Sequence, residues 1–151
     1  MTRGLRIKCL AVVIGLATLT AILHADQIPL GNWVRRPTKD GGSATMLVEG
    51  AGTGQKLTFK VAVANGGTAT MVVTTQFDGK DATVFVDGKP SGETMAISKV
   101  DDHHTTNVIK MNGNPFVTQK SELSSDGKVI KTESTPMVSG AQGGVEYWDK
   151  K

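Results

Sequence analysis

The chain has no means of covalent cross-linking beyond its N-terminal region, because its single cysteine is Cys9. A domain that begins after residue 25 can form no disulfide and must be held together by packing and hydrogen bonding. Aromatic residues are also scarce, with two Trp, one Tyr and four Phe among 151 residues. No stretch after residue 26 has a helical period of apolar residues. The absence of a helical period favours an all-β domain, and the length fits a single domain.

Motifs for catalysis and for cofactor binding are also missing. The glycine-rich stretch 50–56 is followed by a strand pattern, whereas a phosphate-binding loop requires a helix N-terminus at that point. His103 and His104 adjoin Asp101 and Asp102, and we interpret this turn as a solvated loop, because a metal site needs three or four well-placed ligands. No Gly-x-Ser-x-Gly accompanies the histidines. We therefore predict no catalytic residue, no metal, no cofactor and no enzymatic activity.

The first 25 residues have the composition of a secretory signal peptide. Arg3, Arg6 and Lys8 form a basic start, residues 9–23 are mostly apolar, and Ala25 provides a small residue at a cleavage site. The apolar run is short for a transmembrane helix, which needs about 20 residues. We predict a signal-peptide helix over 1–25 and an exported domain over 26–151, periplasmic or extracellular and without a membrane span. The alternative is a retained N-terminal anchor.

Removal of that segment also removes the net positive charge. The whole chain carries 17 Lys and Arg against 14 Asp and Glu, and its pI near 9.1 reflects this surplus. Three of the basic residues and none of the acidic ones lie in 1–25, so 14 of each sign remain in the domain. Binding to nucleic acid needs a basic patch in the folded domain. We therefore predict no nucleic-acid partner.

Short strand patterns separated by turn residues dominate the domain. Apolar and polar residues alternate over 55–64 and 69–77, and the tripeptide Asp-Gly-Lys recurs at 78–80, 87–89 and 126–128. Asp-Gly between apolar-rich runs is a strong hairpin signal, so we expect tight turns at these tripeptides. The strands that we expect span 31–35, 43–51, 55–64, 69–77, 82–86, 93–100, 105–111, 116–123, 129–137 and 143–148.

The connections between these strands are short, which favours an up-and-down antiparallel meander. A β-sandwich would require at least one long crossover connection, and the sequence offers none. A meander removes its exposed edges by closing into a barrel. We predict a barrel of 8–10 strands.

Inward-facing positions change character along the chain. The strands over 55–77 have clean apolar faces, whereas strands from Thr105 onward carry polar residues such as Asn107, Gln119 and Ser121 among the apolar ones. An unpaired buried amide or hydroxyl costs about 1–3 kcal/mol, so a tightly packed core would hold few of them. Two explanations remain open. Either these residues line a partly hydrated cavity, or their strands are twisted, short or exposed.

Several motifs together resemble a known group of proteins. Gly31-Asn32-Trp33 resembles the Gly-x-Trp of lipocalin-like barrels. The segments 77–81, 95–101, 124–128 and 145–150 resemble, in order and spacing, small exported bacterial proteins of unknown function that are grouped with lipocalin-like domains. The resemblance covers most of residues 31–150. It implies a calycin-type β-barrel with a small apolar ligand in its interior. Lipocalins usually place an Arg on the last strand, and this chain has none after Arg36.

We predict from these observations a monomeric, non-catalytic binding protein that holds a small apolar or amphipathic molecule. The expected cavity-lining residues are Trp33, Phe59, Val61, Met71, Val73 and Phe77. Trp33 has two possible roles, closure of the barrel end or ligand contact and a core position, and the large area that an indole buries favours the core. The alternative function is a filled-core structural or interaction domain of the cell envelope that acts through its surface.

Overall fold

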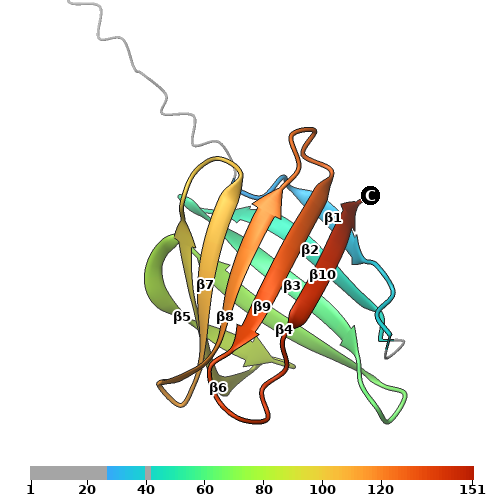
Figure 1. Cartoon of the computed structure of the whole chain (residues 1–151), viewed down its shortest axis with the longest axis vertical. Coiled ribbons are helices and arrows are strands. Elements are labelled where there is room, and N and C mark those ends of the chain that lie inside the picture. The colour runs from blue at the N-terminus through green and yellow to red at the C-terminus, as the bar shows by residue number, and fades with distance from the viewer. Residues whose placement is uncertain (1–26, 40–41) are drawn as a thin grey trace, which may run out of the picture.

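The computed structural model describes residues 27–39 and 42–151 and contains ten β-strands (Figure 1). The predicted signal peptide and its cleavage site lie outside the described residues. Among those residues there is no helix of the length and hydropathy needed to cross a membrane. The strands are β1 (Gly31–Arg35), β2 (Ala44–Ala51), β3 (Gly54–Ala62), β4 (Thr68–Thr75), β5 (Asp78–Val86), β6 (Lys89–Lys99), β7 (His104–Met111), β8 (Asn114–Leu123), β9 (Val129–Pro136) and β10 (Gly144–Lys150).

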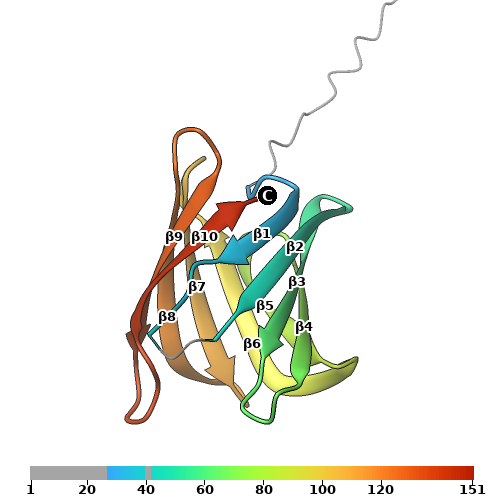
Figure 2. The same ribbon diagram turned by 90° about the vertical axis from the view of Figure 1, so that its right-hand side faces the viewer.

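The ten strands form a closed antiparallel barrel in which every strand pairs with its neighbours in the chain. Closure occurs between β1 and β10, where Trp33 lies opposite Lys150 and Arg35 lies opposite Trp148. Figure 2 shows β1 lying between β10 and β2. The predicted fold, an up-and-down meander that closes into a barrel, is therefore confirmed. The seam between β4 and β5 is the least paired, in register only where Met71 lies opposite Val86 and Val72 lies opposite Phe85.

Two of the tight turns have the backbone conformation that their sequences predict. Asp87 and Gly88 connect β5 to β6 with φ of 48° and 82°, and Asn112 and Gly113 connect β7 to β8 with φ of 49° and 82°. Positive φ at both central residues is the type I′ pattern of two-residue hairpins. Glycine adopts such angles without a steric penalty.

The expected turn at the first Asp-Gly-Lys is wrong. The chain reverses one step earlier, at Gln76 and Phe77, and β5 already begins at Asp78. Asp78 instead accepts a hydrogen bond from the backbone N–H of Lys80 at 3.1 Å, inside a register shift between β5 and β6. The tripeptide thus forms a bulge, because an Asp side chain can bond its own backbone two residues on in either setting.

The segment 27–30 lies at the upper end of the barrel in Figure 1. The Gln55 side chain holds this segment through both of its polar atoms, accepting from the Ile28 N–H at 3.1 Å and donating to the Ile28 carbonyl at 2.7 Å. The Trp33 indole Nε1 donates to the Pro29 carbonyl at 3.0 Å. Trp33, Val48, Val73 and Val84 are the largest fully buried side chains. They belong to a hydrophobic core that also includes Met46, Leu57, Ile97, Ile130 and Trp148.

Candidate ligand-binding cavity

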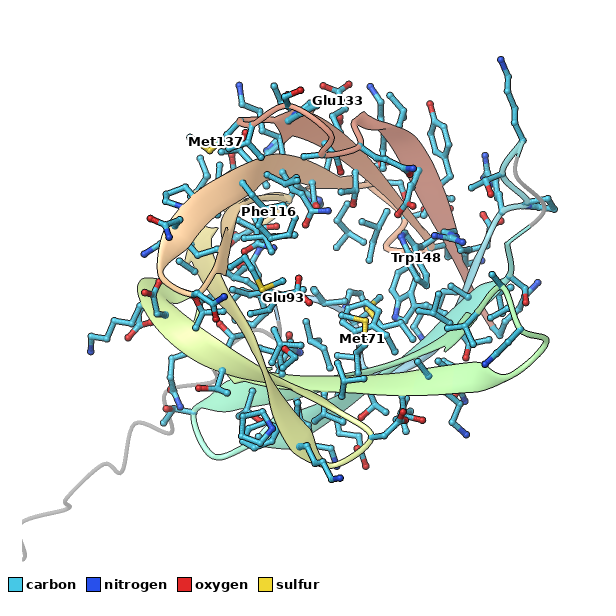
Figure 3. The ribbon with its side chains drawn as sticks, turned by 90° about the horizontal axis from the view of Figure 1, so that it is seen from below. Met71, Glu93, Phe116, Glu133, Met137 and Trp148 are labelled. Carbon is cyan, nitrogen blue, oxygen red and sulfur yellow. The ribbon has the colours of Figure 1, made fainter. Side chains whose placement is uncertain are left out.

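A cavity of about 210 Å³ lies inside the barrel. Figure 3 views the barrel from below and shows Met71, Glu93 and Trp148 around its central opening. The side chains that line the cavity come from both halves of the meander, and the two halves differ in chemistry.

One side of the cavity is apolar and is formed by β2, β3 and β4. Its lining residues alternate along these strands, because successive side chains of a strand point to opposite faces. Met46 and Leu57 are buried, whereas Phe59, Val61 and Met71 are half-buried. We call this set the apolar wall: Ala44, Met46, Leu57, Phe59, Val61 and Met71.

The opposite side is polar and is formed by β7, β8 and β9. We call this set the polar wall: Thr105, Asn107, Gln119, Ser121 and Thr132. Asn107 Nδ2 donates to Gln119 Oε1 at 3.0 Å, and the oxygens of Ser121 and Thr132 lie 2.8 Å apart. Each of these pairs joins directly opposed residues of neighbouring strands. The polar wall is therefore a set of cross-strand hydrogen bonds inside the barrel.

Apolar side chains border the polar wall at both ends. Ile109 and Val117 are buried one step below Asn107 and Gln119, and Ile130 is buried one step above Thr132. Asn107 and Gln119 consequently lie at mid-depth in the barrel, whereas Thr105 lies near the first residue of β7. Of the two explanations for polar residues at inward positions, the structure supports the first, because these residues line a cavity.

An ion pair connects the two halves where the barrel closes. Arg35 of β1 donates from Nη1 to Glu146 of β10 at 2.9 Å and from Nη2 to the Gly42 carbonyl at 2.9 Å. The two side chains are only 15% and 31% exposed. Both line the cavity. The guanidinium and the carboxylate therefore neutralise each other within the wall.

Some polar atoms of the lining have no partner. Among the described residues, four buried side-chain nitrogen or oxygen atoms lack a hydrogen bond, and three of them belong to lining residues: Gln27 Oε1, Arg35 Nε and Asn107 Oδ1. Buried polar groups in folded proteins are almost always satisfied, so each exception needs an explanation. Asn107 is 9% exposed, and its free oxygen belongs to the polar wall.

An acidic side chain lies at the lower opening. Glu93 of β6 is half-buried, and burial raises the pKa of its carboxyl group above the ordinary value. Figure 3 shows it on the opposite side of the opening from Trp148. The Trp148 indole faces the Phe59 ring edge-on, with 5.9 Å between the ring centroids. Aromatic surface and a carboxyl group thus border the same opening.

The residues expected from the sequence divide into two groups. Phe59, Val61 and Met71 line the cavity, whereas Trp33, Val73 and Phe77 do not. Trp33 and Val73 are buried in the hydrophobic core, and Phe77 lies in the β4–β5 turn and packs against that core. Alternation places a residue inside the barrel but says nothing about its depth, so the sequence could not separate these groups.

Sequence reasoning missed the ion pair and the segment 27–30 at the upper end of the barrel. Arg35 and Glu146 are 111 residues apart, and only the pairing of β1 with β10 brings them together. The one signal was that each occupies an inward position of a strand pattern, two residues from a Trp. Gln27 and Ile28 precede the first strand and carry no periodic signal.

The histidine turn contains a hydrogen-bonded pair. The His104 Nδ1 lies 2.8 Å from Asp101 Oδ1, and the backbone N–H groups of His103 and His104 donate to the same carboxylate oxygen. These bonds hold the pKa of Asp101 below its ordinary value, with the His103 backbone making the largest contribution. Within 27–39 and 42–151 no three His, Cys, Asp or Glu side chains gather as a metal site would require.

The fold and the site define a ten-stranded antiparallel barrel with an internal cavity, consistent with a calycin-like architecture. Comparison with protein-family models, with curated proteins and with solved structures finds no match for this chain. Its function must therefore be argued from the geometry of the cavity.

Proposed function

We propose that this protein is an exported, monomeric, non-catalytic binding protein that holds one small amphipathic molecule inside its barrel. The observation that carries the proposal is the cavity itself, lined by an apolar wall on β2–β4 and a polar wall on β7–β9. Ligand sites are typically concave and mostly apolar, with a few polar groups that orient the ligand.

The size of the cavity supports a small ligand. An apolar cavity of roughly 150 Å³ is large enough to hold benzene, and drug-sized ligands occupy pockets of roughly 300–1,000 Å³. At about 210 Å³ the cavity lies between these limits. It therefore suits a molecule of about one ring with a substituent, or a short chain of similar volume.

Export is proposed on the composition of residues 1–25. The basic start, the apolar run and the small residue at position 25 match a secretory signal. The resemblance to small exported lipocalin-like proteins points the same way. Both features belong to the sequence, and the proposed binding in the cavity does not depend on them.

Native mass spectrometry of the protein purified from an exporting host tests the proposal, with the denatured mass measured on the same sample. We expect a discrete excess mass in the native spectrum that disappears on denaturation and gives the mass of the ligand. The denatured mass identifies the processed N-terminus, for which we expect a chain beginning at Asp26. A mass that includes residues 1–25 would contradict the predicted cleavage.

The competing function is an interaction domain that acts through its surface. A bare chain, still bare after incubation with a lipid extract, would favour it and overturn the binding proposal. Exposed apolar side chains at the lower rim, namely Val63, Met137, Val138 and Val145, are the observation that favours this second function.

A further inference from the structure

We infer that the cavity selects an uncharged ligand with a hydroxyl or N–H group, which donates a hydrogen bond to Asn107 Oδ1 while its apolar body lies on the apolar wall. This inference rests on the proposed binding function and narrows the class of ligand. It joins three observations: an orphaned acceptor at mid-depth, the neutralised ion pair, and the size of the cavity.

The acceptor is available because its neighbours Gln119, Ser121 and Thr132 on the polar wall are already paired. Asn107 gives its Nδ2 to Gln119, and Gln119 Nε2 donates to Ser134 Oγ at 3.1 Å. Ser121 and Thr132 satisfy each other. Asn107 Oδ1 is left without a partner in a side chain that is 9% exposed. A ligand donor at this atom removes an unsatisfied buried acceptor, which otherwise costs about 1–3 kcal/mol.

The same lining is unsuited to an anionic ligand such as a fatty-acid carboxylate. Arg35 is the one Lys or Arg among the lining residues, and Glu146 neutralises its charge. Its two terminal nitrogens are occupied by Glu146 and the Gly42 carbonyl, and its Nε is the one nitrogen of the guanidinium group without a partner. Glu146 places a carboxylate in the wall, and Glu93 adds an acidic group at the lower opening. An anion would have to enter without a free counter-charge, and burying an unpaired charge is strongly unfavourable.

A fully apolar ligand fits less well for a complementary reason. It would cover the polar wall without pairing Asn107 Oδ1 and would also displace any water bound there. A site that is built to hydrogen-bond a substrate hydroxyl discriminates strongly against an analogue that lacks it. The preferred ligand is therefore amphipathic, uncharged and a hydrogen-bond donor.

Three probes of nearly equal size test this inference by isothermal titration calorimetry at pH 7. 4-Ethylphenol carries an O–H donor, its isomer 4-methylanisole has the same atoms without the donor, and 4-methylbenzoate is ionised at this pH. We expect 4-ethylphenol to bind about tenfold more tightly than 4-methylanisole, which corresponds to about 1.4 kcal/mol. We expect 4-methylbenzoate to bind most weakly of the three.

Asn107→Leu should abolish the preference between the two isomers, because it removes the acceptor. Asn32→Leu makes the same change at an exposed position on the outward face of β1 and should leave the preference unchanged. Nuclear magnetic resonance on the unaltered protein gives a second readout, since 4-ethylphenol should shift the Asn107 side-chain amide signals. The isomer comparison and this shift decide the inference even if Asn107→Leu does not fold.

The outcomes separate this inference from the function on which it rests. Equal affinity for all three probes, or strongest binding of 4-methylbenzoate, would overturn the inference and leave a binding protein of different selectivity. Failure of all three probes would also overturn it, and the excess native mass would still decide the binding function. A tenfold preference that disappears in Asn107→Leu and persists in Asn32→Leu would establish it.

Discussion

The apolar wall and the polar wall are built from the same kind of strand and differ in what they contribute. On β3 the inward positions are Leu57, Phe59 and Val61, and their burial stabilises the barrel through the hydrophobic effect. On β8 the inward positions include Gln119 and Ser121, which gain only hydrogen bonds of modest net free energy. The apolar wall therefore contributes mainly to the stability of the barrel. The polar wall contributes little stability, so stability alone does not explain why polar residues occupy these inward positions.

The largest expected effect is on the apolar wall. Leu57→Ala should lower the free energy of unfolding by about 2–5 kcal/mol, because it removes buried methyl groups and enlarges the cavity. Urea denaturation followed by Trp fluorescence measures this. Lys60→Ala, on the exposed face of the same strand, should change stability by less than about 0.5 kcal/mol. Equal effects of the two substitutions would contradict the assignment of the apolar wall.

The ion pair where the two halves meet should show a smaller effect. Arg35→Met leaves the Glu146 carboxylate and the Gly42 carbonyl without their partner, which we expect to cost about 1–3 kcal/mol. This is below the roughly 3–5 kcal/mol of a fully buried pair, because both side chains are partly exposed. Adding Glu146→Leu should recover much of the loss, and a double-mutant cycle measures the coupling. Strictly additive effects would show that the pair contributes nothing specific.

On the polar wall, we expect a single substitution to lower the free energy of unfolding more than a double substitution does. Gln119→Leu leaves Asn107 Nδ2 and the Ser134 hydroxyl unpaired and should cost about 1–3 kcal/mol. The double variant Asn107→Leu with Gln119→Leu should be closer in stability to the parent, because replacing both partners by apolar groups can be nearly neutral. Urea denaturation of the two single variants, Asn107→Leu and Gln119→Leu, and of the double variant measures the difference. A double variant that loses the sum of the two single effects would mean that the polar wall is needed for stability.

The smallest expected effect is on the pH dependence of stability and comes from Glu93 at the lower opening. Burial raises the pKa of Glu93, so between its ordinary pKa and the raised one the folded protein retains a proton that the unfolded chain has released. Stability conferred by this group is therefore present at low pH and is lost as pH rises through that interval. Glu93→Gln removes this loss, so the variant should gain stability over the parent as pH rises from about 4 to 7.

Glu133→Gln is the matched control for this pH effect and should behave in the opposite way. The ammonium group of Lys131 lowers the pKa of Glu133 on the outer surface, chiefly through a side-chain hydrogen bond. A lowered pKa stabilises the fold at neutral pH, and this contribution is lost on acidification. The variant should therefore lose stability relative to the parent as pH rises. Chemical denaturation measures the Glu93→Gln slope above the ordinary Glu pKa and the Glu133→Gln slope below it, and slopes of the same sign would contradict these assignments.

The sequence predicted most of the strands and the closure of the barrel, and the wrong predictions concern single turns and single residues. Alternation located ten strands within a few residues of their observed bounds, and the short connections predicted closure. The first Asp-Gly-Lys was misassigned because the same residues serve turns and bulges. Three of the six expected lining residues, Phe59, Val61 and Met71, border the cavity, and Trp33, Val73 and Phe77 lie elsewhere.

The sequence by itself determined which residues form strands and which side of each strand faces inward. These properties depend on neighbouring residues, through a period of two and through local turn chemistry. Only the tertiary structure decided which inward residues share a depth and meet across the barrel. That depends on the register of ten strands and on the pairing of β1 with β10, which brings Arg35 to Glu146. Register between distant strands is set by packing the whole barrel at once, so no short stretch of sequence encodes the cavity.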